Sequence, residues 1–199
     1  MATTFFLLRH AAHDRVGSVL CGRMPGVALS ARGQAQAARL AELLGRESIA
    51  AVHTSPLERC RNTAAPLARR LGLQPVVAEE INEIDFGLWT GQDFDILERD
   101  PRWRRWNQAR DSAEAPGGES MRAAQARAVR HIEASRARHP DAGLAIVSHC
   151  DVLKAVLAHY LGLPLQAYER IEIGPASVSL LVAWEGGGKV IGMNDLRAA

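Results

Sequence analysis

Short apolar runs alternate with segments of helical periodicity along most of the chain, and this alternation constrains the fold more than any other feature. Residues 5–8, Phe-Phe-Leu-Leu, form a continuous apolar run, which predicts a strand covered on both faces. Further strands are predicted at about 50–53, 75–78, 144–147, 177–184 and 189–193. Helices are predicted at about 32–44, 59–71, 120–138 and 152–161. Strands that alternate with helices predict an α/β domain with a mainly parallel sheet.

Local signals place several of the element ends. Ser30 has the side chain of an N-cap for the first helix, and Gly72 is a typical stop after the second. Pro66 lies inside that second helix, so we expect a kink or a break there. The length of 199 residues suits one domain with a sizeable core, and we expect residues 1–199 to form a single domain.

The composition argues against several classes of partner. Apolar residues make up 47% and charged residues 23% of the chain, as is usual for a globular protein. A net charge of +2 does not indicate nucleic acid or a membrane as a partner, and no apolar stretch approaches the roughly 20 residues that span a bilayer. Three cysteines without short spacing predict neither a disulfide framework nor a zinc site. Arg9 and His10 interrupt the first apolar run, which favours a buried strand over a signal peptide. We therefore expect a cytoplasmic location.

Polar residues that can handle phosphate follow directly after three of the predicted strands. Arg9-His10 ends the first strand, Ser55 to Arg59 follows the second, and Ser148-His149 ends the fourth. Ligands of open α/β sheets bind outside the carboxyl ends of the strands. We therefore expect these two arginines and two histidines to converge on one crevice.

Such a crevice holds the groups that phosphoryl transfer needs. Guanidinium groups donate paired hydrogen bonds to phosphate oxygens. A neutral imidazole can attack phosphorus and carry the phosphoryl group, while a second, protonated imidazole can stabilise the equatorial oxygens. These cationic groups can take the place of a metal ion. What is still missing is an acid that protonates the leaving alkoxide.

Five segments, in this order along the chain, resemble the motifs of the histidine phosphatase (phosphoglycerate-mutase-like) superfamily. They are Leu7-Leu8-Arg9-His10-Ala11, Ser55–Ala64, Asn82–Gly91, Gly117-Gly118-Glu119-Ser120 and Ser148-His149-Cys150-Asp151. The stretch 20–37 also resembles the region between the first two motifs, and the similarity runs from about residue 5 to 180. The resemblance implies a three-layer α/β/α sandwich of the phosphoglycerate-mutase-like type, with a mainly parallel sheet and one late antiparallel strand.

The resemblance also implies a role for each matching residue. His10 is the phosphorylated nucleophile, Glu83 is the proton donor, and Arg9, Arg59 and His149 form the phosphate pocket. It implies neither a cofactor nor a metal ion. A general acid works best when its pKa is near the operating pH, so we expect Glu83 to titrate high in a partly buried site.

Three assignments keep an alternative open. Asp85, two residues after Glu83, is the rival acid. A metal site that includes His10, His13 and His149 can be drawn, but ligand spacing on a helix or hairpin is absent. Arg23 is a candidate for binding a second anionic group of the substrate, and a structural salt bridge is the alternative.

Ala11 and Cys150 stand at positions where the family pattern has glycines. Alanine is a mild change if its φ is negative. Cys150 is expected to contact the substrate, either as a small buried filler or as a redox-sensitive thiol whose pKa is lowered by cationic neighbours.

Residues 92–119 are less regular and are predicted to form a cap-like insertion. Within it, Arg99, Arg102, Arg104, Arg105 and Arg110 surround Trp103 and Trp106. We expect a lid that contacts the part of the substrate beyond the phosphate. A solvated amphipathic helix and a nucleic-acid surface, in which aromatic rings stack on bases, are the alternatives.

The favoured function is a metal-independent phosphomonoester hydrolase that acts on a small-molecule phosphate through a phosphohistidine on His10. The alternatives are mutase-type phosphoryl transfer to a sugar acid and a regulatory domain that binds a phospholigand without turnover. Phosphosugars, phosphoserine, nucleotide-loop phosphates of cobamide synthesis and phosphoproteins are the candidate substrates. The sequence leaves the oligomeric state open, with a homodimer among the states to test.

Overall fold

The computed structural model describes residues 1–199 and contains a six-stranded sheet in the order β3-β2-β4-β1-β5-β6. The strands are β1 (Ala2–Arg9), β2 (Ile49–Thr54), β3 (Val76–Val77), β4 (Gly143–Ser148), β5 (Val178–Trp184) and β6 (Gly187–Asp195). Strands β1 to β4 run parallel to one another, while β5 is antiparallel to both β1 and β6. The predicted α/β class, mainly parallel sheet and late antiparallel strand are confirmed.

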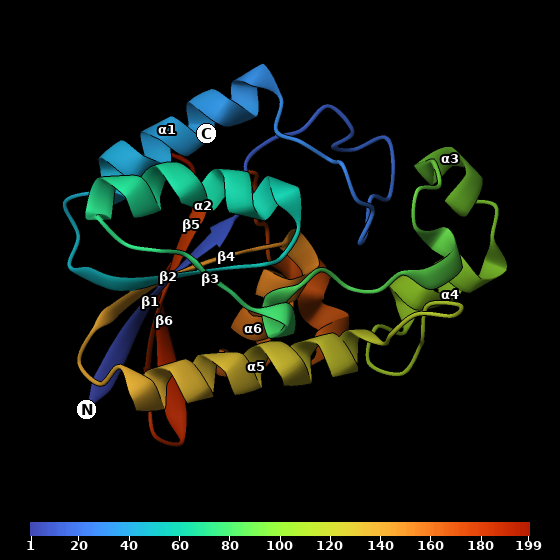
Figure 1. Cartoon of the computed structure of the whole chain (residues 1–199). Coiled ribbons are helices and arrows are strands. Elements are labelled where there is room, and N and C mark those ends of the chain that lie inside the picture. Colours follow the sequence, from blue (N-terminus) through green and yellow to red (C-terminus); the bar gives the residue numbers. More distant parts are fainter.

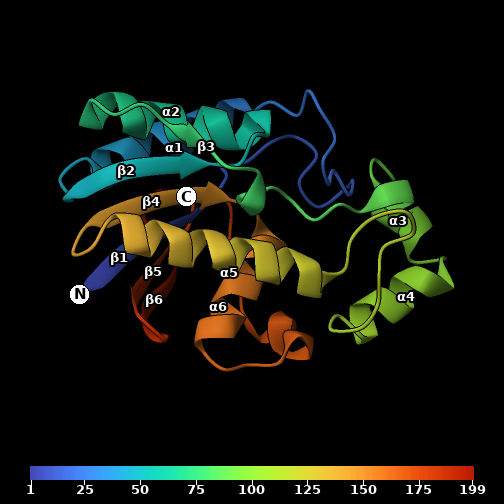
Figure 2. The same cartoon turned by 60° about the horizontal axis from the view of Figure 1, so that its bottom comes forward.

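Helices cover both faces of this sheet. The helices are α1 (Ala31–Leu44), α2 (Glu58–Leu71), α3 (Phe94–Leu97), α4 (Pro101–Gln108), α5 (Met121–Arg138) and α6 (Cys150–Tyr160). Helices α1 and α2 lie side by side on one face, and α5 and α6 lie on the other (Figures 1 and 2). This is the three-layer α/β/α sandwich that the resemblance implies. None of the helices is both long and apolar enough to cross a membrane.

The central strand β1 shows why both faces are covered. Phe5 and Leu7 belong to the core under α5 and α6, whereas Phe6 and Leu8 belong to the core under α1 and α2. Successive side chains of a strand point to opposite faces, so a continuous apolar run fills two cores at once. Complete burial of one such side chain stabilises the fold by roughly 1.5–3 kcal/mol.

Most predicted helix ends are found where the local signals place them. The hydroxyl of Ser30 accepts a hydrogen bond from the Gly33 N–H, as an N-cap does. Gly72 ends α2 in the left-handed conformation, with φ of 69°. The expected break at Pro66 is wrong, because α2 runs unbroken through it. The carbonyl that loses its helical hydrogen bond belongs to the exposed Asn62, where solvent replaces the lost donor.

The segment 92–119 carries the short helices α3 and α4, which extend beyond the edge of the sandwich (Figure 1). Trp103 and Trp106 are buried, and they pack against Phe86 and Trp89 with ring centroids 5.3 to 6.5 Å apart. Buried rings cannot stack on bases, so the segment does not have the arrangement of a nucleic-acid surface. Its tryptophans instead join it to the core under α5 and α6.

The sheet order brings the predicted strand ends together. Arg9, the last residue of β1, is in register with Ser148, the last residue of β4. The His10 N–H donates to the Ser148 carbonyl at 2.9 Å, and the Ser55 N–H donates to the Val147 carbonyl at 3.0 Å. The segments that follow β1, β2 and β4 therefore begin next to one another at one edge of the sheet.

Candidate active site

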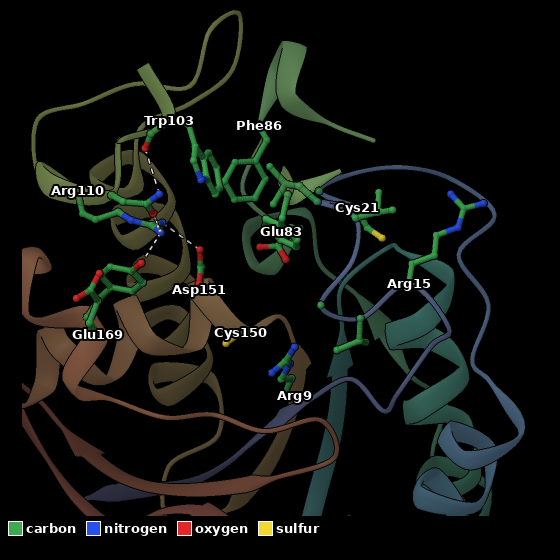
Figure 3. A pocket seen from close by; sticks show the side chains of 18 of the residues that line it. Arg9, Arg15, Cys21, Glu83, Phe86, Trp103, Arg110, Cys150, Asp151 and Glu169 are labelled. Carbon is green, nitrogen blue, oxygen red and sulfur yellow. Dashed lines mark hydrogen bonds and ion pairs between the residues drawn. The ribbon is translucent and has the colours of Figure 1, made fainter. Parts of the chain in front are cut away.

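A cavity of about 640 Å³ lies at this edge of the sheet (Figure 3). It is lined by Arg9, His10, His13, Arg59, Glu83 and Cys150, among others. Trp103 and Arg110 of the 92–119 segment also line it, and Asp151 and Glu169 lie next to Arg110, as Figure 3 shows. The volume lies within the range typical of small-molecule sites.

His10 has the hydrogen bonding and protonation of a nucleophile. Its side chain is buried, and Nδ1 lies 2.9 Å from the Ala11 carbonyl oxygen. A carbonyl only accepts hydrogen bonds, so the proton is on Nδ1 and the lone pair on Nε2. Burial, followed by the charges of Arg59 and Arg9, holds the pKa of His10 well below its usual value. The ring is therefore neutral at neutral pH and able to attack phosphorus.

Two guanidinium groups stand beside His10 with unused donors. Arg59 is almost completely buried, and its Nε and Nη1 have no hydrogen-bond partner in the protein. Its Nη2 donates to the Gly22 carbonyl at 2.7 Å, which fixes the plane of the group. Arg9 donates from Nη1 to the Ile173 carbonyl at 2.6 Å, and its buried Nε is also unpaired. Unpaired buried donors are costly, and an anion such as phosphate would satisfy them.

His149 is completely buried and lies behind the residues that line the cavity. Its ring centroid is 5.3 Å from that of His10. Nη2 of Arg59 lies 3.2 Å from Nδ1, and the Ser55 hydroxyl lies 2.8 Å from Nε2. Because a guanidinium can only donate, the neutral ring carries its proton on Nε2.

The expectation of a protonated His149 does not hold in the free protein. Burial, then the charges of Arg59 and His10, keeps its pKa well below the usual value. A bound phosphate dianion would act in the opposite direction, because a nearby negative charge favours the imidazolium form.

Glu83 has the environment expected of a general acid. Its Oε2 lies 3.6 Å from Nδ1 of His149 and 4.0 Å from Nη2 of Arg59. Burial raises the pKa of this carboxyl to about 7, although the Arg59 charge opposes the shift. The rival Asp85 does not line the cavity, and its side chain is 43% exposed. The structure thus favours Glu83 over Asp85 as the acid.

The two departures from the glycine pattern have local explanations. Ala11 is fully buried, it is not among the residues with positive φ, and its N–H donates to the Thr63 hydroxyl at 2.9 Å. The added methyl therefore brings no backbone strain. Cys150 lines the cavity, and its thiol donates to the Ile173 carbonyl at 3.5 Å. Burial raises its pKa to about 11 and outweighs Arg9, so the expected lowering is wrong and the filler role is favoured.

Arg23 does not line the cavity. Its guanidinium donates to the Glu83 carbonyl at 2.8 Å and to the Glu119 carboxylate at 3.0 Å. The structure thus supports the salt-bridge alternative rather than a second anion site.

The sequence alone did not indicate a place in the site for His13, whose ring stacks on that of His10 with centroids 5.3 Å apart. Its position three residues after His10 is the signal in the sequence that points to this contact. No group of three or more His, Cys, Asp or Glu side chains is placed to hold a metal ion.

A neutral histidine, two guanidinium groups with buried, unpaired donors and a carboxyl group of raised pKa define a site for phosphoryl transfer at the carboxyl edge of an α/β sheet. The chain belongs to the histidine phosphatase superfamily (branch 1), whose family model matches residues 5–196.

Two of the relatives of this chain are named as phosphatases. The chain is 33% identical over 155 residues to phosphoserine phosphatase 1 of Hydrogenobacter thermophilus, covering 77% of this chain and 74% of that protein. It is 32% identical over 174 residues to glucosyl-3-phosphoglycerate phosphatase of Mycobacterium tuberculosis, covering 82% and 78%. Among solved structures, Bacillus stearothermophilus YhfR matches with a TM-score of 0.91 at 27% identity, covering 98% of each chain. The chain spans only 50% of a bifunctional mycobacterial relative at 34% identity over 181 residues. Family and relatives together make this chain a phosphatase of a class that acts without a metal ion.

Proposed function

We propose that the chain hydrolyses a small-molecule phosphomonoester by double displacement through a phosphohistidine on His10. The observation that carries this proposal is the neutral His10 ring, with its lone pair on Nε2, beside the unpaired donors of Arg9 and Arg59. In the first step Nε2 attacks phosphorus, and the bond from phosphorus to the leaving oxygen breaks. Charge that develops on the equatorial oxygens is stabilised by the two guanidinium groups, each worth about 3–4 kcal/mol in the transition state.

Glu83 supplies the proton that the leaving alkoxide requires. With a pKa of about 7, its carboxyl is substantially protonated at neutral pH. After the alcohol leaves, the carboxylate accepts a proton from the water that attacks the phosphohistidine. Phosphate departs, and both His10 and Glu83 return to their starting forms. His149, which lies behind the residues that line the cavity, would stabilise the phosphoryl charge electrostatically once that charge raises its pKa.

The substrate is proposed to be a small phosphorylated metabolite with a polar leaving group. Phosphoserine and glucosyl-3-phosphoglycerate are the first compounds to test, because two relatives are named for them. A cytoplasmic location and a homodimer belong to the same proposal. The three unpaired cysteines suit a reducing compartment, and light scattering of the purified protein tests the oligomeric state.

The stereochemical course at phosphorus tests the double displacement. Hydrolysis of a chiral isotopically labelled phosphomonoester, with EDTA present, should proceed with net retention, since two in-line displacements each invert the centre. Net inversion would mean that water attacks the substrate directly.

His10→Gln should lower kcat by about 10⁴-fold or more, as loss of a nucleophile does in other covalent enzymes. His159→Gln, a change of the same type at an exposed histidine, should leave kcat unaltered.

A further inference from the structure

The carboxylate of Glu119 lies at the centre of a polar cluster that the proposed mechanism does not use. Its Oε1 accepts hydrogen bonds from Nη2 of Arg127 at 2.6 Å, from Nη2 of Arg23 at 3.0 Å and from the Asp85 N–H at 2.9 Å. Its Oε2 accepts from Nε of Arg127 at 3.1 Å. The side chain of Glu119 is 18% exposed and that of Arg127 is 13% exposed. Charge-assisted bonds in such a shielded site are the strong kind.

The same two guanidinium groups hold the backbone around the proposed acid. Arg127 donates from Nη1 to the carbonyls of Glu80 and Asn82, both at 2.7 Å, and from Nη2 to the Glu83 carbonyl at 3.0 Å. Arg23 donates from Nε to the Glu83 carbonyl at 2.8 Å. The carbonyl of Glu83 therefore accepts from two arginines that both pair with one carboxylate.

The loops that carry Glu83 and Glu119 also meet backbone to backbone. The Glu119 N–H donates to the Asp85 carbonyl at 2.9 Å. A Cβ atom added to Gly118 would lie 2.1 Å from the Asp85 carbonyl oxygen, and one added to Gly87 would lie 2.2 Å from the Pro116 carbonyl oxygen. This close approach requires glycine on both sides. A displacement of Glu119 would consequently move the loop that carries the acid.

None of the three cluster residues lines the cavity, whereas the side chain of Glu83 does. We propose that Glu119, with Arg127 and Arg23, is a positioning residue that fixes the Glu83 carboxyl against Arg59 and His149 and so governs proton donation to poor leaving groups. The inference rests on the proposed role of Glu83. The Gly117-Gly118-Glu119 motif would then position the general acid Glu83 and would not bind the phosphate.

The leaving group separates this role from general destabilisation. The measured quantity is kcat/KM, which reports formation of the phosphohistidine and not its hydrolysis. In Glu119→Gln, kcat/KM for an alkyl phosphate such as β-glycerophosphate should fall by about 10–100-fold, as expected for a misplaced catalytic group. With p-nitrophenyl phosphate, whose leaving group needs no proton, the decrease in kcat/KM should stay below about threefold because acid catalysis adds little to this step. Arg23→Met keeps the Glu119–Arg127 pair. It should lower kcat/KM on the alkyl and aryl phosphates in the same pattern as Glu119→Gln, but by a smaller factor. Arg122→Gln, at an exposed position of α5, the helix that carries Arg127, is the control and should change neither value.

A double variant tests whether Glu119 acts through Glu83. Glu119→Gln combined with Glu83→Gln should be no slower on the alkyl phosphate than Glu83→Gln alone, because the misplaced group is already absent. A further loss in the double variant, or equal losses on the two substrates, would show a purely structural role and overturn the inference. If Glu119→Gln does not fold, Arg23→Met in the same cycle gives the answer. Turnover that persists in His10→Gln would instead refute the proposed function. Failure of the positioning role and failure of the proposed function thus give different results.

Discussion

His10 and Glu83 line the same cavity, and the same cause, burial, shifts their pKa values in opposite directions. Burial penalises the charged form of each group, so the histidine becomes neutral and the carboxyl becomes protonated. Those are the forms that a nucleophile and a general acid require. The Arg59 charge adds to the shift of His10 and opposes that of Glu83.

The lowered pKa of His10 and the raised pKa of Glu83 together predict how kcat/KM on an alkyl phosphate depends on pH. A raised pKa means that Glu83 loses its proton, and with it the donor form, as the pH rises through about 7. We expect kcat/KM to fall above pH 7 by about tenfold per unit, while the acidic limb, set by protonation of His10, lies well below pH 6.5. Glu83→Gln should be slower and should lack the alkaline limb.

A rate profile on p-nitrophenyl phosphate serves as the control for that measurement. There kcat/KM of Glu83→Gln, which reports formation of the phosphohistidine, should remain close to that of the unaltered chain across the range, while kcat falls because the base for the second step is lost. An alkaline limb that persists in Glu83→Gln with the alkyl phosphate would assign the acid to another residue.

At the scale of elements, helix α1 supports the segment that follows His10. The Ser30 N–H and hydroxyl both donate to the Ala12 carbonyl, at 3.1 and 3.2 Å. The Ala12 N–H donates to the Gln36 side chain at 2.9 Å. A Cβ atom added to Gly33 would lie 1.9 Å from the Ala12 carbonyl oxygen, so the first turn of α1 fits only because residue 33 is glycine.

Gly33→Ala should therefore disturb the nucleophile from a distance. We expect overpacking to lower the free energy of unfolding by roughly 1–3 kcal/mol, measured by urea denaturation. The shift of Ala12 should also lower kcat on alkyl and aryl phosphates by the same factor, since it acts on His10 and not on the acid. Gly192→Ala, where an added Cβ meets no atom within 4 Å, is the control. Equal stability and activity of the two variants would contradict this description of α1.

Patterns within single elements made much of the fold predictable. The run Phe5 to Leu8 and the alternation of strands with helices indicated a covered sheet, and Ser30 and Gly72 indicated helix ends. The break expected at Pro66 failed because one missing hydrogen bond on the solvent side of a well-packed helix costs too little to interrupt it.

At the scale of the whole molecule, the site depends on contacts that no local pattern contains. The resemblance indicated that His10, Arg59 and Glu83 belong to one site, and all three line the cavity, whereas His149 lies behind the lining. It could not place Arg23, whose partner Glu119 is 96 residues away in the chain. Nor could it show that burial outweighs cationic neighbours at Cys150, because that balance depends on the folded surroundings of the thiol.

The 92–119 segment lines part of the cavity, with Trp103 and Arg110 among its residues. Arg110 donates to Asp151 at 3.1 Å and to the Tyr168 hydroxyl at 2.6 Å, with its guanidinium 3.9 Å from the centre of the Tyr168 ring. These contacts of Arg110, drawn in Figure 3, join the 92–119 segment to the α/β/α sandwich. The cap-like role and its contact with the leaving group remain predictions, which the choice of substrate will test.

The identity of the phosphorylated residue tests the central claim most directly. The protein is mixed with a ³²P-labelled phosphomonoester under single-turnover conditions, quenched in alkali and digested, and the labelled peptide is mapped by mass spectrometry. The account predicts an acid-labile, base-stable label on His10 that is absent from His10→Gln. A label on another residue, or turnover in His10→Gln at the rate of the unaltered chain, would contradict it.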